Sequence, residues 1–455
     1  MPLTRRQFGS TMLGTAFAGL AARAYADAPP MGRDEVPGFG DLVPDPNRLL
    51  DLPEGFSYKV ISRLGNVMDD GMVVPGMADG MGCFDAGVDK VALVRNHELS
   101  HNQLRQGPFR AKPDESFKAY DSMTKKPGLP LPGGTTTMIY DMAKGKVTAE
   151  WLSLSGTVRN CSGGITPWGS WLTCEESNYL VEDGAGKNHG YVFEVPALQK
   201  GLADPVPLKE MGRFVREAVC VDPRTGIVYM TEDSGDSLFY RFIPKVKGKL
   251  AEGGTLQALA LKGIPDTSNV GSAMVKLGEK YRAKWITLDN PESPDSDLRK
   301  RGAALGCTKF IRGEGIFWDD KAKNLYFTAT SGGAAKYGQI FRYTPSKKEG
   351  GKGKQGYLEL FLESADPATY NLGDNIAVMP NGHLMVCEDQ YTPITNNHLR
   401  CVTPEGKTYR FARTRIQSEF CGACFSSDGS TMFVNLQIPT TTFAITGPWD
   451  RVVSS

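Results

Sequence analysis

A cysteine beside a glycine-rich turn stands close to a pair of carboxylates in the middle of the chain. Cys161 follows Asn160 and precedes a Ser-Gly-Gly run, and Glu175 and Glu176 come one short hairpin later. A thiolate is a soft metal ligand, whereas carboxylates are hard ones. Glycines let the backbone approach a ligand closely. The stretch therefore predicts a site that binds metal ions through both sulfur and oxygen.

A loose repeat must position these residues. Each copy is a short apolar strand, a turn rich in Asp, Pro, Gly or Asn, and a second strand of β-branched and aromatic residues. The copies lie at residues 83–98, 163–176, 217–233, 314–330, 374–389 and 422–437. They predict an all-β fold, a six-bladed β-propeller with inserted loops and short helices. A two-sheet sandwich is the alternative.

In a propeller hairpin, the start of the first strand and the end of the second face the central channel. Copy three places Glu217 and Glu232 there, and copy five places Asp374 and Glu388 there. The other copies add Glu98, one residue of the pair 175–176, and Glu314. Of that pair we expect Glu175 to face the channel. The last carboxylate is Asp374, Glu388 or Asp389.

Several carboxylates in one pocket repel one another, and bound cations relieve that repulsion. Oxygen ligands suit calcium, whereas a nearby thiolate suits iron or zinc. Ligand softness therefore favours a mixed site of iron and calcium. His97 is either a ligand or a hydrogen-bond partner of Glu98, and Arg312 is placed to hold an anionic oxygen.

Composition excludes several classes of function. The chain has 52 basic and 51 acidic residues and a net charge of +1, so it has no basic excess for nucleic acid. The 5 histidines are too few for a His-rich metal site. No GxSxG motif accompanies a catalytic triad, so a serine nucleophile is poorly supported. Cys421 and Cys424 form a CxxC without a second one, which supports a zinc site only weakly.

The first residues read as an export signal. Arg5 and Arg6 form a twin-arginine pattern, an apolar run follows, and Ala24-Tyr25-Ala26 is a small-x-small cleavage site. We expect a signal peptide at 1–26 and a single catalytic propeller domain at 27–455. The protein would be exported folded by the twin-arginine machinery to the periplasm or beyond. No later run is apolar enough for a membrane anchor.

From Asn160 to Glu176, the chain resembles the PhoX-type alkaline phosphatases. The twin-arginine leader, Asn96-His97-Glu98, Arg216-Glu217-Ala218, Arg312-Gly313-Glu314 and the terminal FVNLQIP run are also similar to that family. The resemblance covers essentially the whole mature chain. It implies an exported six-bladed propeller that hydrolyses phosphate monoesters. The implied cofactor is an iron pair, bridged by a cysteine thiolate, with an oxo group and calcium ions.

The resemblance also implies roles for individual residues. Cys161 is similar to the bridging thiolate, Glu98 and Glu217 to shared metal ligands, and Glu314 to a calcium ligand. Arg312 is similar to a phosphate clamp that stabilises transition-state charge. Glu217 and Arg312 are the predicted catalytic residues, and Arg159 and Asn160 are candidates for substrate binding. The family nucleophile is a metal-bound oxygen.

The sequence therefore predicts a monomeric, metal-dependent phosphatase acting on small phosphomonoesters. One alternative is a calcium-dependent propeller lactonase or esterase, which would need no thiolate ligand. Another is a non-catalytic propeller whose acidic rim binds structural calcium.

Overall fold

The computed structural model describes residues 32–452 except positions 112, 115, 125–127, 354 and 391–396. In this part of the chain regular structure is almost entirely β-strand, and the one α-helix is α3 (Leu298–Ala304). The 3-10 helices are η1 (Leu104–Gln106), η2 (Val181–Asp183), η3 (Lys209–Met211) and η4 (Leu250–Glu252). No described helix is long and apolar enough to cross a membrane. The predicted leader lies outside the described residues.

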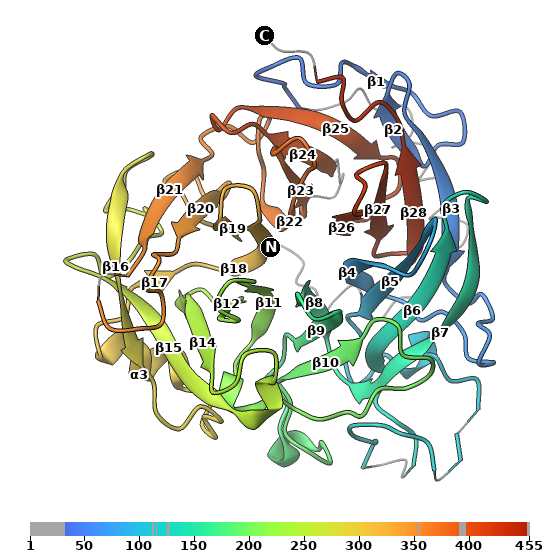
Figure 1. The fold of residues 1–455 in the computed structure, drawn as a ribbon, viewed down its shortest axis with the longest axis horizontal. Helices are drawn as coiled ribbons and strands as arrows, with labels where there is room; N and C mark the ends of the chain where they lie inside the picture. Colours follow the sequence, from blue (N-terminus) through green and yellow to red (C-terminus); the bar gives the residue numbers. More distant parts are fainter. Residues whose placement is uncertain are drawn as a thin grey trace, which may run out of the picture.

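Six strands stand around the centre of the molecule, and each packs against the next to close a ring (Figure 1). They are β4 (Ala78–Asp85), β8 (Asn160–Ile165), β11 (Arg216–Val221), β18 (Gly313–Asp319), β22 (Gly373–Val378) and β26 (Phe420–Phe425). Each is the first strand of an antiparallel hairpin. The second strands are β5 (Lys90–His97), β9 (Ser170–Glu175), β12 (Val228–Glu232), β19 (Asn324–Ala329), β23 (Leu384–Glu388) and β27 (Thr431–Leu436).

Further strands extend the hairpins outward. Two four-stranded sheets have the orders β4-β5-β6-β7 and β26-β27-β28-β3, with β6 (Gly133–Asp141), β7 (Lys146–Thr157), β28 (Thr441–Thr446) and β3 (Ser57–Arg63). A six-stranded sheet runs β22-β23-β24-β25-β2-β1, with β24 (His398–Val402), β25 (Thr408–Thr414), β2 (Leu50–Pro53) and β1 (Leu42–Val43). A three-stranded sheet adds β10 (Val192–Pro196) to β8 and β9.

The remaining strands lie on one side of the ring. A nine-stranded sheet joins the β11 and β18 hairpins through β14 (Tyr240–Pro244), β15 (Gly254–Leu261), β16 (Lys280–Thr287), β21 (Tyr357–Glu363) and β20 (Gln339–Thr344). A small two-stranded sheet pairs β13 (Ser237–Leu238) with β17 (Lys309–Phe310). The long segment between β14 and β18 forms strands β15 to β17 together with η4 and α3.

The predicted all-β propeller is confirmed, but the predicted number of six blades is not. Hydrogen bonding gives four sheets of four or more strands. Two hairpins share the nine-stranded sheet because residues 280–282 of β16 pair with 357–359 of β21. The β8–β10 sheet stays at three strands, since the following segment contains Pro205 and Pro207 and proline lacks the N–H that a ladder needs.

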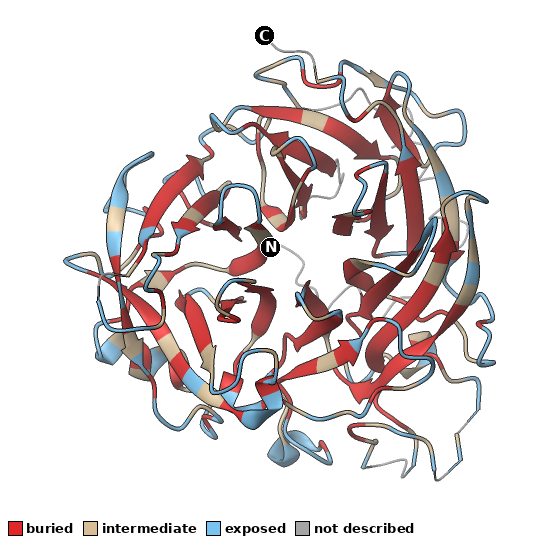
Figure 2. Cartoon of the chain, in the orientation of Figure 1, coloured by how far each residue is buried: buried red, intermediate tan, exposed pale blue. Residues whose placement is uncertain are grey.

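The two ends of the described chain meet in one sheet. β3, near the start, pairs antiparallel with β28, near the end, from Arg63↔Thr441 to Ser57↔Thr446 (Figure 1). This pairing closes the ring between the last hairpin and the first. The inner strands are buried along most of their length, whereas exposed residues gather on the outer strands and loops (Figure 2). Apolar residues fill the space between neighbouring sheets; Phe239 and Phe327, for example, stack at 4.4 Å.

Candidate metal centre

Every inner strand begins with an irregularity in its pairing register. In β11, for example, the shift falls between Arg216 and Val219, and the other five inner strands have an equivalent shift. A β-bulge of this kind re-aims a side chain out of the ladder. The second residue of the strand is a carboxylate or a cysteine in all six cases: Asp79, Cys161, Glu217, Glu314, Asp374 and Cys421.

The residue directly after each second strand forms another repeated position. Its backbone N–H donates to the carbonyl of the residue two places before the bulged position, at 2.8–3.3 Å. These residues are Glu98, Glu176, Asp233, Thr330, Asp389 and Gln437, and their acceptors are Met77, Arg159, Val215, Arg312, Leu372 and Glu419. The six hairpins thus share one construction at the same end, which presents two positions per repeat.

Seven of these side chains meet in three overlapping groups. In each group the possible ligand atoms lie within 4.8 Å of one another. Cys161 belongs to the first two groups and Glu217 to the last two. The groups are Asp79 with Glu98 and Cys161, Cys161 with Glu176 and Glu217, and Glu217 with Glu314 and Asp374.

Burial and mutual repulsion oppose ionisation in this cluster. Burial raises the pKa of the Cys161 thiol well above its usual range, and the charges of the nearby carboxylates raise it further. The pKa of Glu217 is raised well above normal, first by burial and then by Asp374 and other carboxylates. Burial, with Asp233 and Asp374, likewise raises the pKa of Glu314. Burial and mutual repulsion therefore favour the protonated forms of these three groups when no cation is bound.

Glu217 shows that the cluster fits metal ions. Both of its carboxylate oxygens are buried, and apart from the Cys161 thiol no described group donates a hydrogen bond to either of them. A buried carboxylate without donors is costly unless it is protonated or binds a cation. The donor set around it, one thiol and several carboxylates, suits a softer transition metal at Cys161 and an oxygen-seeking ion farther along.

Two arginines flank the cluster at equivalent repeat positions. Arg159 and Arg312 each precede a bulged residue by two places, and both have the left-handed φ of 48°. Arg159 pairs with Glu176 and, at 2.7 Å, with Glu98. Arg312 pairs with Asp233 at 2.8 Å and with Glu314 at 2.7 Å. Met77 and Leu372, at the same position in two other repeats, have similar φ values of 53° and 50°, so this backbone conformation belongs to the repeat.

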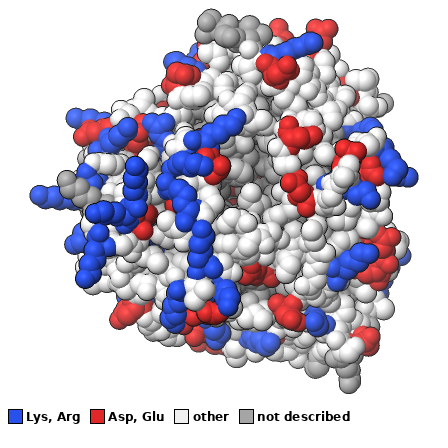
Figure 3. All heavy atoms as spheres, in the orientation of Figure 1, with Lys and Arg blue, Asp and Glu red and all other residues white. Residues whose placement is uncertain are grey.

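Both guanidinium groups reach the surface at the mouth of the ring. Their side chains are each 27% exposed, whereas the carboxylates of Glu98 and Glu314 beneath them are buried. The molecular face is hollowed near its centre, and both charge signs occur on both sides of the face; directly beside the hollow, a row of Lys and Arg side chains lies along one edge and groups of Asp and Glu lie along the other (Figure 3). An anion entering the hollow can therefore reach cations before it reaches the buried carboxylates.

The choice of Glu175 as the channel-facing residue is wrong, because Glu176 occupies that position. Glu175 pairs with Asn160 across the hairpin and is fully buried. Its oxygens accept hydrogen bonds from the backbone N–H groups of residues 158, 190 and 191, and from His189 Nδ1 at 2.6 Å. Glu175 therefore fixes the loop that follows its strand instead of facing the cluster.

His189 is held by carboxylates on both ring nitrogens. Nδ1 bonds Glu175, and Nε2 lies 3.2 Å from Asp121. Burial lowers the pKa of His189, but Glu175 and Asp121 raise it to about 9. The imidazolium therefore stabilises the fold fully below its unfolded pKa of 6.5, and this contribution is lost as pH rises through 9.

We expect His189→Gln to destabilise the protein in a pH-dependent way. The loss in free energy of unfolding should reach up to about 3 kcal/mol near pH 6 and shrink toward pH 10. Urea unfolding of chelator-treated wild type and variant between pH 6 and pH 10 measures this difference in the free energy of unfolding. The partly exposed His383, bonded to Tyr409, provides a control as His383→Gln. A loss that is equal at pH 6 and pH 10 would contradict the charged state of His189.

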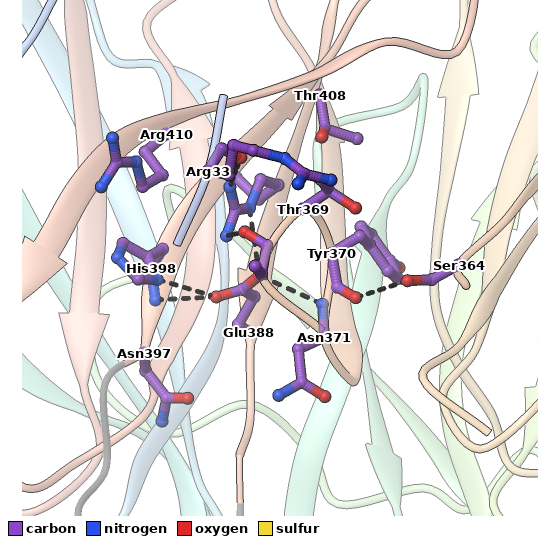
Figure 4. Close-up of polar contacts among 12 residues, drawn as sticks. Arg33, Ser364, Thr369, Tyr370, Asn371, Glu388, Asn397, His398, Thr408 and Arg410 are labelled. Atoms are coloured by element: carbon purple, nitrogen blue, oxygen red, sulfur yellow. Dashed lines mark hydrogen bonds and ion pairs between the residues drawn. The ribbon is translucent and has the colours of Figure 1, made fainter. Parts of the chain in front are cut away.

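Of the carboxylates predicted for copy five, the structure places Asp374 in the cluster and not Glu388. Glu388 is buried in its sheet, where Arg400 and His398 each bond it at 3.1 Å (Figure 4). Burial opposes its ionisation, but the charge of Arg400 and the bond from His398 lower its pKa overall. Glu232, the equivalent residue of copy three, bonds Tyr240 at 2.8 Å.

Two other predicted residues serve the scaffold. Asn160 is buried, donates to Thr173 at 2.9 Å and accepts from Thr157 at 2.6 Å, so its side chain does not face substrate. His97 bonds the carbonyl of Gly76 and the hydroxyl of Thr136 instead of Glu98. Both assignments are corrected, and the physical reason is the same: strand alternation turns these side chains into the sheet.

Sequence reasoning missed Asp79 and Asp233. Asp79 lies in the first group with Cys161, and its Oδ2 accepts the thiol at 3.6 Å. The first repeat copy was placed to start at Cys83, but β4 starts at Ala78, so the repeat was out of phase there. Aligning ADG at 78–80 with REA at 216–218 and GEG at 313–315 would have found Asp79.

At one axial end of the β-propeller, a thiol, six buried or half-buried carboxylates and two partly exposed arginines form a site suited to cations and to an anionic ligand. The sequence pattern of the alkaline phosphatase PhoX family matches residues 37–139 and 134–440. The chain belongs to this family, and it is a phosphoric monoester hydrolase.

Several solved structures are similar to this chain. Pseudomonas fluorescens PhoX in complex with vanadate, a transition state analogue, is 18% identical with a TM-score of 0.65, over 92% of this chain and 98% of that one. A Xanthomonas campestris gluconolactonase is 11% identical with a TM-score of 0.43, over 91% and 100%. A periplasmic gluconolactonase from Pseudomonas aeruginosa is 13% identical with a TM-score of 0.41, over 88% and 94%. A comparison with curated proteins found no match.

Proposed function

We propose that this chain is an exported phosphatase that hydrolyses phosphate monoesters at an iron and calcium cluster in the axial end of its propeller. The observation that carries this proposal is the buried carboxylate of Glu217, which lies between the Cys161 group and the Glu314–Asp374 group and lacks a donor other than the thiol. Membership of the phosphatase family supplies the reaction.

The donor atoms suggest how two kinds of metal would divide the site. Cys161 belongs to two groups, so iron would be held by Cys161 with Asp79 and Glu98, and by Cys161 with Glu176 and Glu217. The group of Glu217, Glu314 and Asp374 offers only oxygen, which suits calcium. Bound cations would polarise the phosphoryl group and neutralise the carboxylates.

The residues of the chain have separate tasks in this scheme. Arg312 and Arg159 would hold non-bridging oxygens of the phosphate, since a guanidinium binds them in a bidentate geometry. The raised pKa of Glu217 favours its protonated form in the metal-free protein, and metal binding would release that proton, because ligating carboxylates must be deprotonated. Glu175, Glu388 and Asn160 would keep the supporting hairpins in place.

Arg312→Ala is expected to lower kcat/KM for p-nitrophenyl phosphate about 100-fold or more, because a charge-stabilising donor is lost. Arg312→Lys should recover only part of the lost kcat/KM, since lysine lacks the planar guanidinium group that can bind two phosphate oxygens. Steady-state kinetics measure both variants. Arg342, 24% exposed and paired with Glu359 on an outer strand, provides a matched control. Equal kinetics in Arg312→Ala and Arg342→Ala would remove Arg312 from the site.

We also propose that the six hairpins count as six blades, two of which have merged at their outer edges. The mature protein would be a single domain at 27–455, released by cleavage of a twin-arginine signal at 1–26. It would act as a monomer in the periplasm or outside the cell.

Elemental analysis combined with a phosphatase assay tests the proposed function. Purified mature protein should contain iron and calcium and release phosphate from a generic phosphomonoester at alkaline pH. Chelation should remove activity, and adding both metals should restore it. If the protein contains calcium but no iron and hydrolyses lactones or carboxylic esters, the result would favour the lactonase alternative. Calcium without any turnover would favour a binding propeller.

A further inference from the structure

The FVNLQIP run at 433–439 reaches the metal centre from the last hairpin. Asn435 and Gln437 are two residues apart, so an extended chain turns both side chains to the same face. Asn435 Nδ2 donates to the backbone carbonyl of Asp79 at 2.7 Å. Gln437 Nε2 donates to Asp79 Oδ2 at 3.2 Å and to Glu98 Oε2 at 3.0 Å. The run therefore contacts two members of the Cys161 group.

Gln437 connects two carboxylates that would otherwise repel each other. Its side-chain amide has two N–H donors, one for each carboxylate. The other Glu98 oxygen pairs with Arg159 at 2.7 Å, and the Cys161 thiol donates to the Asp79 oxygen that Gln437 also contacts. Gln437 is 5% exposed, so water competes little for these bonds.

The contact also crosses the joint where the ring closes. β26 and β27 belong to the sheet completed by the N-terminal strand β3, whereas Asp79 and Glu98 belong to the first hairpin, β4 and β5. Four of the other five equivalent positions carry an acidic residue, namely Glu98, Glu176, Asp233 and Asp389. The last repeat instead supplies a neutral donor where a further carboxylate would add repulsion.

We propose that Gln437 is a positioning residue that holds Asp79 and Glu98 at the spacing needed to bind a cation together with Cys161. This inference rests on the proposed iron and calcium site. Gln437 itself stays outside the ligand set, and its amide orients the ligands through hydrogen bonds. Removing such a partner typically weakens metal binding 10- to 100-fold.

Two variants test the role. Gln437→Met keeps the volume and removes the donors, and Gln437→Glu keeps the shape and replaces the donors with a charge. In the full mature enzyme, we expect both Gln437 variants to lose iron to a chelator at least about 10-fold faster than wild type. Visible absorbance and metal analysis measure this loss. Turnover number should fall by about the same factor while KM for p-nitrophenyl phosphate stays within about twofold.

A matched control separates this role from packing. Gln339 is fully buried and bonds Glu363 at 2.8 Å, away from the cluster, so Gln339→Met should retain iron like the wild type. Wild-type protein without iron would overturn the proposed function and this inference with it. Wild-type protein with iron, but the same chelation rate in both Gln437 variants, would overturn the inference alone. A rise in KM at unchanged turnover would also overturn it.

Discussion

Cys161→Ala is expected to abolish phosphatase activity and the visible colour of the protein together. The thiol belongs to two of the three ligand groups, so its loss would leave neither iron position with a sulfur ligand. Loss of a residue that only orients a metal ligand typically lowers metal affinity or activity 10- to 100-fold. Loss of the shared ligand itself should therefore lower kcat/KM at least about 1000-fold. Kinetics, absorption spectroscopy and metal analysis on one preparation measure the activity, the colour and the metal content.

Cys174→Ala is the matched control for this experiment. Cys174 is fully buried in β9, on the partner strand of the same hairpin, but packs in an apolar cluster with Leu172 and Val192. Its replacement should cost stability and leave colour and metal content unchanged. Full activity in Cys161→Ala, or loss of colour in both variants, would exclude the thiolate ligand.

Glu217→Gln is expected to have opposite effects on activity and on the stability of the metal-free protein. The loaded enzyme should lose activity at least about 100-fold, because an amide is a weaker ligand than a carboxylate. The metal-free variant should be more stable than metal-free wild type near pH 8. Burial and neighbouring carboxylates raise the pKa of Glu217 well above 4.5 in the folded chain, so ionising it there costs free energy.

The sign of the pH dependence follows from that raised pKa. The folded chain binds a proton on Glu217 more tightly than the unfolded chain does. Metal-free wild type should therefore lose stability as pH rises from about 4.5 through the folded-state pKa, and Glu217→Gln should lose less. Urea unfolding of both chelator-treated proteins at pH 5 and pH 8 measures the difference.

Glu175→Gln provides the contrast. The Glu175 carboxylate accepts four hydrogen bonds, some of which an amide cannot accept, so the variant should be destabilised while it still binds metals. A metal-free Glu217→Gln protein that is less stable than wild type at pH 8 would show that Glu217 is not a buried, strained carboxylate.

Most members of the site could be predicted from the repeat and the family motifs. Glu98, Cys161, Glu217, Glu314 and Asp374 all lie in the cluster, because each copy carries a carboxylate or a cysteine at the same offset. Gln437 lay within a recognised motif, but its sequence did not show that it reaches across to the first hairpin.

The alternation of side chains along a strand led to wrong assignments of which residue faces the channel. In an ideal hairpin, the last residue of the second strand faces the channel. On this basis Glu175 and Glu388 are predicted to face the cluster. In the structure the channel-facing residue is the next one, Glu176 or Asp233 for example, whose N–H bonds back across the hairpin end. The bulge at the start of each inner strand shifts the register, and a sequence pattern cannot locate a one-residue shift.

The sequence by itself determined that the chain is all-β, that it repeats a hairpin, and that the repeats bring a thiol and carboxylates to one place. These properties follow from local alternation, turn chemistry and spacing. Only the tertiary structure decided how outer strands merge, which of two adjacent carboxylates enters the cluster, and which residues meet across the closing joint. Those outcomes depend on register and on contacts between segments hundreds of residues apart, such as Gln437 with Asp79, which no local pattern encodes.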